Sequence, residues 1–211
     1  MSYSVKELFY TLQGEGAQTG RAAVFCRFSG CNLWSGLEKD RHKTLCSFCD
    51  TDFVGTDGEG GAKFSNAADL AQAIIASWPD MTQGVPYVVF TGGEPLLQLD
   101  AELIEQLHQA GFEVGVETNG TLKAPEGIDW ICVSPKNPHD LKQTSGQEIK
   151  LLYPLDNISP ADCEHFDFEY FYLQAVDDAA NNNNQQAVVD YCLAHPRWQV
   201  SLQTHKILNL K

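Results

Sequence analysis

The sequence predicts an α/β fold, specifically a partial (incomplete) TIM-like (β/α) barrel built on a mainly parallel sheet. Short runs rich in Val, Ile, Phe and Tyr alternate with helical stretches, and this alternation is typical of parallel sheets. A complete eight-fold barrel takes about 250 residues, whereas this chain has 211. No helical pattern is evident at 135–147. We therefore expect a barrel that lacks some of its helices.

The expected elements follow from hydrophobic patterning along the chain. A strand and turn are expected at 3–20, where Gly14, Gly16 and Gly20 act as breakers. Further strands are predicted at 22–28, 86–91, 112–118, 129–134, 148–153, 168–174 and 199–204. Helices are predicted at 66–78, 100–110 and 185–195.

Two of the helices carry start signals in the sequence. Asn66 and Asp69 occupy capping-box positions ahead of the apolar face of 66–78. Asp100 can cap the start of the helix at 100–110, and Gly111 follows its end.

The chain is expected to form a single domain over 1–211. We expect an N-terminal strand and turn extension at 1–20 and a loop at 29–65 that carries a possible metal site. Within that loop, the glycine-rich segment 55–61 suggests flexibility, and 181–184 reads as a polar surface loop.

Composition narrows the function classes. The net charge is −14, from 14 basic and 28 acidic residues, and Lys and Arg are not clustered. A nucleic-acid-binding protein would normally show a basic face, so we expect a small-molecule substrate. No apolar run approaches the roughly 20 residues of a membrane span, and no signal peptide is evident. We expect a cytoplasmic protein that does not bind membranes.

Three cysteines close together, Cys31, Cys46 and Cys49, are the most informative chemical signal. Their C-x14-C-x2-C spacing offers three thiolates, one fewer than an iron–sulfur cluster normally takes, so one iron would stay open to a small molecule. The alternative is a structural zinc site that adds His42 as its fourth ligand. The other four cysteines are interpreted as small buried hydrophobic residues, and they are Cys26, Cys132, Cys163 and Cys192.

Polar residues also follow several predicted strands. The strand ends read TGGEP at 91–95, ETNG at 117–120, SPK at 134–136, Gln174, and QTHK at 203–206. Each could be an ordinary turn. Because active sites of α/β folds lie at the carboxyl ends of the strands, these residues together predict one functional rim.

At this point the chain resembles a known family. The cysteines, TGGEP and the partial barrel are similar to radical S-adenosylmethionine enzymes. More closely, the chain resembles the 7-carboxy-7-deazaguanine synthase family over nearly its whole length. The matching segments are FYTLQGEG at 9–16, VFCRF at 24–28, GCNLW at 30–34, FCDTD at 48–52, ETNG at 117–120, VSPK at 133–136 and QTHK at 203–206.

The resemblance implies a reaction and its cofactors. Family enzymes convert 6-carboxy-5,6,7,8-tetrahydropterin to 7-carboxy-7-deazaguanine and ammonia on the way to queuosine and other deazapurines. They are lyases that use a 4Fe-4S cluster, S-adenosyl-L-methionine and Mg²⁺. A flavodoxin-type reductant and a homodimer are further expectations from the family.

The resemblance also implies roles for individual residues. Cys31, Cys46 and Cys49 would hold the cluster and Thr51 the magnesium ion, while Glu15 and Glu117 would be catalytic. S-adenosylmethionine would meet Phe48, Asp50, Gly93, Glu94, Asn119, Ser134, Pro135, Lys136 and Gln174. The pterin would meet Leu12, Gln13, Gly14, Glu15, Arg27, Thr91 and Lys211.

The chain departs from the family pattern at two points, and other roles remain open for Arg27 and for the whole protein. The first cysteine gap holds fourteen residues instead of the usual three, and the chain ends in Lys211 where family members end in proline. Arg27 suits the substrate carboxylate, with an ion pair to a neighbour such as Glu15 as its structural alternative. The rival functions are another radical S-adenosylmethionine enzyme, such as a glycyl-radical activase, and a non-catalytic zinc-binding domain.

Overall fold

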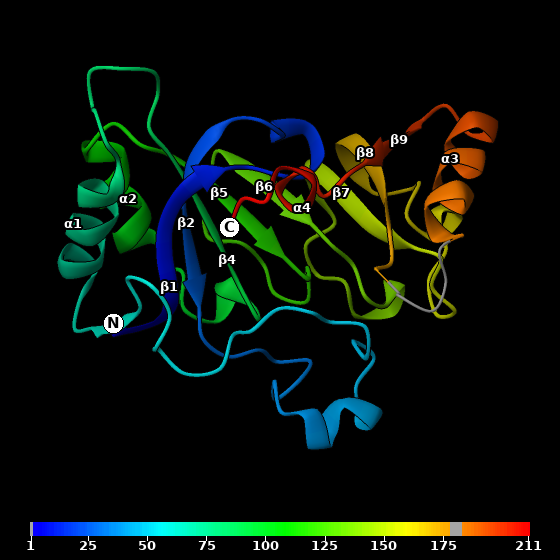
Figure 1. The fold of residues 1–211 in the computed structure, drawn as a ribbon, viewed down its shortest axis with the longest axis horizontal. Coiled ribbons are helices and arrows are strands. Elements are labelled where there is room, and N and C mark those ends of the chain that lie inside the picture. The colour runs from blue at the N-terminus through cyan, green and yellow to red at the C-terminus, as the bar shows by residue number, and fades with distance from the viewer. Residues whose placement is uncertain (1, 178–182) are drawn as a thin grey trace.

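The strands form one curved sheet with both edges open. The computed structural model describes residues 2–177 and 183–211, and within them the sheet has nine strands in the order β3-β1-β2-β4-β5-β6-β7-β8-β9 (Figure 1). β1 pairs antiparallel with β2 and β3, and every pairing from β2–β4 to β8–β9 is parallel. The predicted partial barrel with a mainly parallel sheet is confirmed.

The elements have the following bounds. The strands are β1 (Tyr3–Leu12), β2 (Ala22–Phe28), β3 (Ala62–Phe64), β4 (Tyr87–Gly92), β5 (Glu113–Thr118), β6 (Trp130–Val133), β7 (Ser145–Tyr153), β8 (Asp167–Ala175) and β9 (Trp198–Ser201). The α-helices are α1 (Ala67–Ser77), α2 (Ala101–Gln109), α3 (Asn184–Ala194) and α4 (Thr204–Leu208). Short 3-10 helices include η1 (Gly16–Gln18) and η2 (Glu38–Lys43).

The structure corrects three predicted boundaries. The strand predicted at 148–153 begins earlier, at Ser145, because it pairs with β8 from that residue onward. The strand predicted at 199–204 ends at Ser201, since the backbone N–H and hydroxyl of Thr204 both bond to the Gly14 carbonyl and α4 begins there. The loop predicted at 29–65 contains the short strand β3, which pairs with the start of β1.

The predicted helix caps are confirmed. The Asn66 side chain accepts a hydrogen bond from the Asp69 amide at 2.9 Å, and the Asp100 side chain accepts one from the Leu103 amide at 3.0 Å. Of the polar surface loop expected at 181–184, residues 181 and 182 lie outside the described residues, and the expectation is wrong for Asn184, which is buried and begins α3. Among the described residues, none of the helices combines the length and apolarity needed to cross a membrane.

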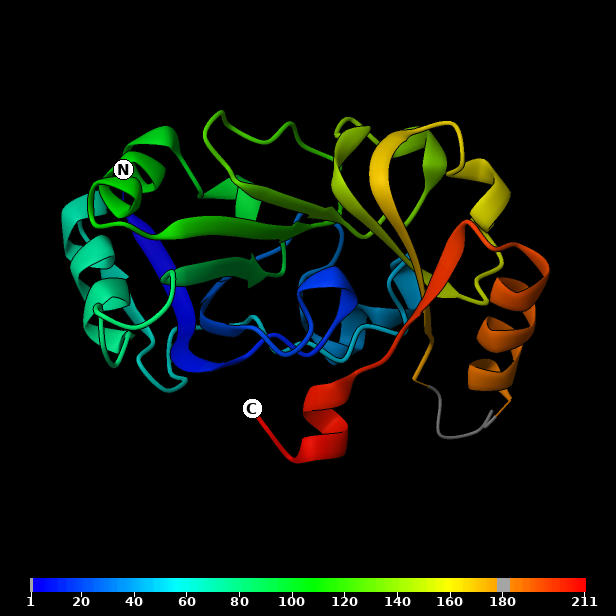
Figure 2. The same ribbon diagram turned by 90° about the horizontal axis from the view of Figure 1, so that it is seen from above.

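The apolar side chains gather in two main cores along the sheet. The larger core packs α1 and α2 against β1, β2, β4 and β5, and the second packs α3 against β7, β8 and β9. Figure 2 shows these helices at opposite ends of the molecule. Among the described residues, Ile131 of β6 packs against both cores. The polar residues predicted to form a rim lie at or just after the ends of β4, β5, β6, β8 and β9.

Candidate active site

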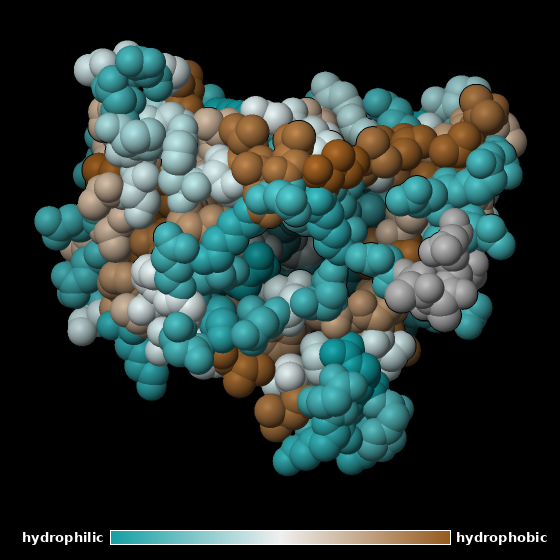
Figure 3. Space-filling model, in the orientation of Figure 1, coloured by the Kyte–Doolittle hydropathy of each residue, from teal (hydrophilic) through white to brown (hydrophobic). Residues whose placement is uncertain are grey.

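A cavity of about 480 Å³ opens where the parallel strands end. Figure 3 shows it as a hollow near the centre of one face. Most of the predicted site residues line it. They are Leu12, Gln13, Gly14, Glu15, Arg27, Cys31, Cys46, Phe48, Cys49, Asp50, Thr51, Thr91, Gly93, Glu117, Asn119, Ser134, Lys136, Gln174 and Lys211. The fold therefore brings residues from most of the chain to one cavity, as expected from the polar residues that follow the predicted strands.

The three cysteines face this cavity together as free thiols. Cys31 follows β2, whereas Cys46 and Cys49 come after η2. The fourteen residues between Cys31 and Cys46 therefore form a loop that leaves the cavity wall and returns to it. Burial raises the pKa of the Cys31 and Cys46 thiols, which favours their protonated form unless a cation binds.

The zinc alternative finds no support in this geometry. His42 is exposed on η2. In the part of the chain that the structure describes, no three His, Cys, Asp or Glu side chains are close enough to share one metal ion.

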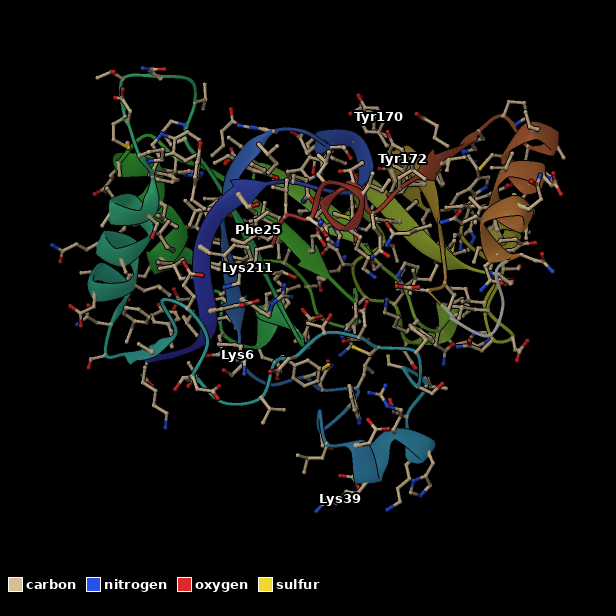
Figure 4. The ribbon with its side chains drawn as sticks, viewed as in Figure 1. Lys6, Phe25, Lys39, Tyr170, Tyr172 and Lys211 are labelled. Atoms are coloured by element: carbon tan, nitrogen blue, oxygen red, sulfur yellow. The ribbon has the colours of Figure 1, made fainter. Side chains whose placement is uncertain are left out.

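Two basic side chains hold the cysteine loop in place. The Lys6 ammonium, almost buried, lies 2.8 Å from Asp52 and 2.7 Å from Asp57 and donates to the Val54 carbonyl at 2.9 Å. Arg41 stacks 4.3 Å above the Trp34 ring and donates to the Cys49 carbonyl at 2.9 Å. Lys6 lines the cavity, whereas Lys39 does not and projects from η2 at the bottom of Figure 4.

The donor set and its surroundings fit an iron–sulfur cluster. Three thiols are the protein ligands that a cluster with one open iron takes. Trp34 lines the same wall, and its buried indole N–H has no hydrogen-bond partner among the described residues. A Cβ at Gly93 would lie 2.6 Å from the Cys31 Cβ, which means that only glycine lets β4 come this close to the loop.

Two predicted residues lie outside the cavity wall among the described residues. Glu94 is fully buried, and its carboxylate accepts hydrogen bonds from the Thr118 hydroxyl at 2.7 Å and from the Asn119 and Leu96 amides. Burial raises its pKa, although these donors oppose the shift. Glu94 thus links the end of β4 to the end of β5 by hydrogen bonds. Its carboxylate does not line the cavity in which S-adenosylmethionine is expected to bind. Pro135 is also buried behind the wall.

Arg27 lies on the cavity wall, but its partner differs from the one expected. Its Nε donates to Glu7 at 2.7 Å, so the suggested ion pair with Glu15 is wrong. The reason is register, because β1 and β2 pair Glu7 directly opposite Arg27. The rings of Phe9 and Phe25 stack nearby with centroids 5.8 Å apart, and both line the cavity.

The C-terminal segment completes the wall. Lys206 of α4 lies 2.6 Å from Asp177 and 3.1 Å from Asp50, and the Lys211 ammonium lies 2.7 Å from Glu59. Lys211 lines the cavity, as do Lys6 and Phe25, and all three are labelled in Figure 4. Lys211, which the resemblance places against the pterin, therefore lies on this wall.

Sequence reasoning missed the buried charge of Lys150. Lys150 of β7 lines the cavity, 2.6 Å from Glu15 and 3.4 Å from Glu117. A signal was present, because Glu148 and Lys150 alternate with apolar residues in a predicted strand and so share one face. Gln203 and His205 also line the cavity, although only their place at a strand end was noted.

The comparisons with known proteins agree with this arrangement. No family model matches the chain. It is 59% identical to the 7-carboxy-7-deazaguanine synthase of Caulobacter vibrioides and 58% identical to that of Bordetella pertussis, with all of each chain covered. The crystal structure of QueE from Escherichia coli aligns with a TM-score of 0.66 and 26% identity, over 96% of this chain and 94% of that one. The chain therefore belongs to the 7-carboxy-7-deazaguanine synthase family of enzymes.

Proposed function

We propose that this enzyme converts 6-carboxy-5,6,7,8-tetrahydropterin to 7-carboxy-7-deazaguanine and ammonia, as a carbon–nitrogen lyase of the radical S-adenosylmethionine type. The family relationship supports the overall reaction. The observation that carries the chemistry is the convergence of Cys31, Cys46 and Cys49 on the cavity that also holds the polar strand ends.

The cysteine end of the cavity suits the cluster and its cosubstrate. The three thiolates would hold a 4Fe-4S cluster, which, when reduced, supplies the electron that starts radical cleavage of S-adenosylmethionine. Gly93, Asn119, Ser134, Lys136 and Gln174 line the wall from the ends of β4 to β8 and would orient that cosubstrate, with Phe48 and Asp50 beside it. Glu94 would act mainly by fixing the backbone of Asn119, to which it is bonded at 2.8 Å.

The part of the wall formed by β1 and β2 suits the pterin. Arg27 offers a guanidinium to its carboxylate, and the Phe9 and Phe25 rings give a flat apolar surface beside it. Glu15 and Glu117 present carboxylate acceptors that can hold or move a proton. Thr51 lies on the wall next to the cysteine loop, where its hydroxyl, with substrate oxygens, would form a hard shell for Mg²⁺.

Two further aspects of the proposal concern partners. An electron must reach the cluster from outside, and we propose a flavodoxin-type reductant. We also propose that the enzyme works as a homodimer in the cytoplasm.

Anaerobic purification followed by a turnover assay tests the function. We expect a brown protein with stoichiometric iron and sulfide that releases ammonia and 7-carboxy-7-deazaguanine when given the pterin, S-adenosylmethionine, magnesium and a reductant. A colourless zinc protein would overturn the cluster. A brown protein that cleaves S-adenosylmethionine but leaves the pterin unchanged would favour a different radical enzyme.

A further inference from the structure

Lys150 is a buried ammonium placed between the two carboxylates to which we assign catalysis. Its side chain is 5% exposed, and its Nζ lies 2.6 Å from Glu15 Oε2 and 3.4 Å from Glu117 Oε2. The three residues come from the turn after β1, from β5 and from β7, so their meeting depends on the fold. A buried ion pair costs much desolvation and adds little net stability, which makes a purely stabilising role a poor explanation.

Each carboxylate is held at both oxygens. The second oxygen of Glu15 accepts a hydrogen bond from the Gln203 amide at 3.0 Å, and that of Glu117 accepts one from the Gln13 amide at 2.8 Å. Lys150 therefore supplies the charge, and the two glutamines fix the remaining orientation. Both carboxylates stay on the cavity wall as acceptors.

Among the described residues, Lys150 is the cation that lies within ion-pair distance of both Glu15 and Glu117. Burial alone would raise the pKa of Glu15, but attraction and a hydrogen bond from Lys150, with a hydrogen bond from Gln203, lower it to about 2. Burial also disfavours the Lys150 cation, yet Glu117 and Glu15 raise its pKa well above the usual range. The other titratable groups that face the trio are Tyr87 of β4, Cys132 of β6, Lys136 after β6, Glu148 of β7 and His205 of α4.

We propose that Lys150 is a positioning residue whose ammonium holds Glu15 and Glu117 as an oriented pair of ionised acceptors facing the substrate. The inference rests on the proposed function, which gives these carboxylates a reaction to serve. Without the ammonium, a buried Glu15 would take up a proton at higher pH and could no longer accept one from the pterin.

The test compares Lys150→Met, which keeps the length but loses the charge, with Lys150→Arg, which keeps the charge. Lys63→Met, on the exposed face of β3, is the matched control. We expect Lys150→Met to retain cluster content and S-adenosylmethionine binding but to lose about 100-fold in kcat, a typical loss for misplaced acid–base catalysis. The acidic limb of its kcat/KM profile should move up by at least one pH unit. Lys150→Arg should restore that limb, and Lys63→Met should match wild type.

A direct readout separates charge from folding. In protein labelled with ¹³C at glutamate carboxyls and carrying its oxidised cluster, the Glu15 signal, assigned with Glu15→Gln, should titrate at higher pH in Lys150→Met than in wild type. If wild type turns over but Lys150→Met shifts neither the titration of Glu15 nor the acidic limb of the kcat/KM profile, the proposal is wrong. If Lys150→Met fails to fold, Lys150→Gln combined with Glu117→Gln removes the pair together, and the Glu15 signal of that variant must then move. Absence of turnover in wild type would instead overturn the proposed function and the positioning role with it.

Discussion

Arg27→Ala tests where the substrate carboxylate binds. Arg27 is 21% exposed in its side chain, lines the cavity and uses its Nε for Glu7, so the rest of the guanidinium is available to a ligand. A hydrogen bond to a charged group contributes about 1.5–3 kcal/mol, which corresponds to about a 10- to 150-fold weaker Kd for the carboxylated pterin. The variant also removes the closer of two cations beside Glu7 and leaves Lys211 at 3.8 Å, so Glu7 would repel the bound carboxylate more strongly and the loss should lie toward the upper end.

Calorimetric titration of the variants under anaerobic conditions measures this effect. A pterin without the 6-carboxyl group should bind wild type weakly and lose little more in Arg27→Ala. Adding Glu7→Gln to Arg27→Ala should recover part of the affinity, because it removes the repelling charge. Arg21→Ala is the matched control, since Arg21 is also paired with one carboxylate, Glu113 at 2.6 Å, but lies outside the cavity wall. Equal weakening of both pterins would show that Arg27 supports the ring or the fold and would refute the assignment.

Further variants test the cluster ligands, the magnesium site and Glu94. Alanine at any one of the cluster cysteines should abolish iron–sulfide content and turnover, whereas His42→Ala should keep both; metal loss on changing His42 instead would restore the zinc hypothesis. Thr51→Ala should lower turnover and weaken its dependence on added magnesium at unchanged iron content, and an unaltered magnesium titration would remove Thr51 from that site. Glu94→Gln should lower the free energy of unfolding by about 1–3 kcal/mol, measured by chemical denaturation, because the new amide group faces donors where a carboxylate accepted them. A fully stable Glu94→Gln protein that fails to bind S-adenosylmethionine would show a direct ligand role.

The sequence predicts the fold, and which residues line the site, better than it predicts the contacts among those residues. Periodicity and strand-end polarity predict which residues reach the rim, because parallel strands end at the same edge of a sheet. They do not tell which buried groups pair across strands. The partner of Arg27 depended on the β1–β2 register, and the burial of Glu94 depended on how closely Gly93 lets β4 approach the cysteine loop.

Lys150 and the end of the chain show a second limit. A lysine in an apolar strand signals an unusual environment, but its two carboxylate partners lie 135 and 33 residues away in the sequence. The helix α4 is only five residues long, too short for a periodic pattern, and its start depends on a tertiary contact with Gly14.

The division of the apolar interior into two cores has a consequence for cooperativity. Ile131 is the described side chain that packs against both, so each half can open with its own free energy, as separate units of amide hydrogen exchange. Glu117 comes from the half that holds α1 and α2, and Lys150 from the half that holds α3. A ligand bound between them would therefore link the two units, and slowed exchange in β7 and β5 together would report occupancy of a cavity that touches both.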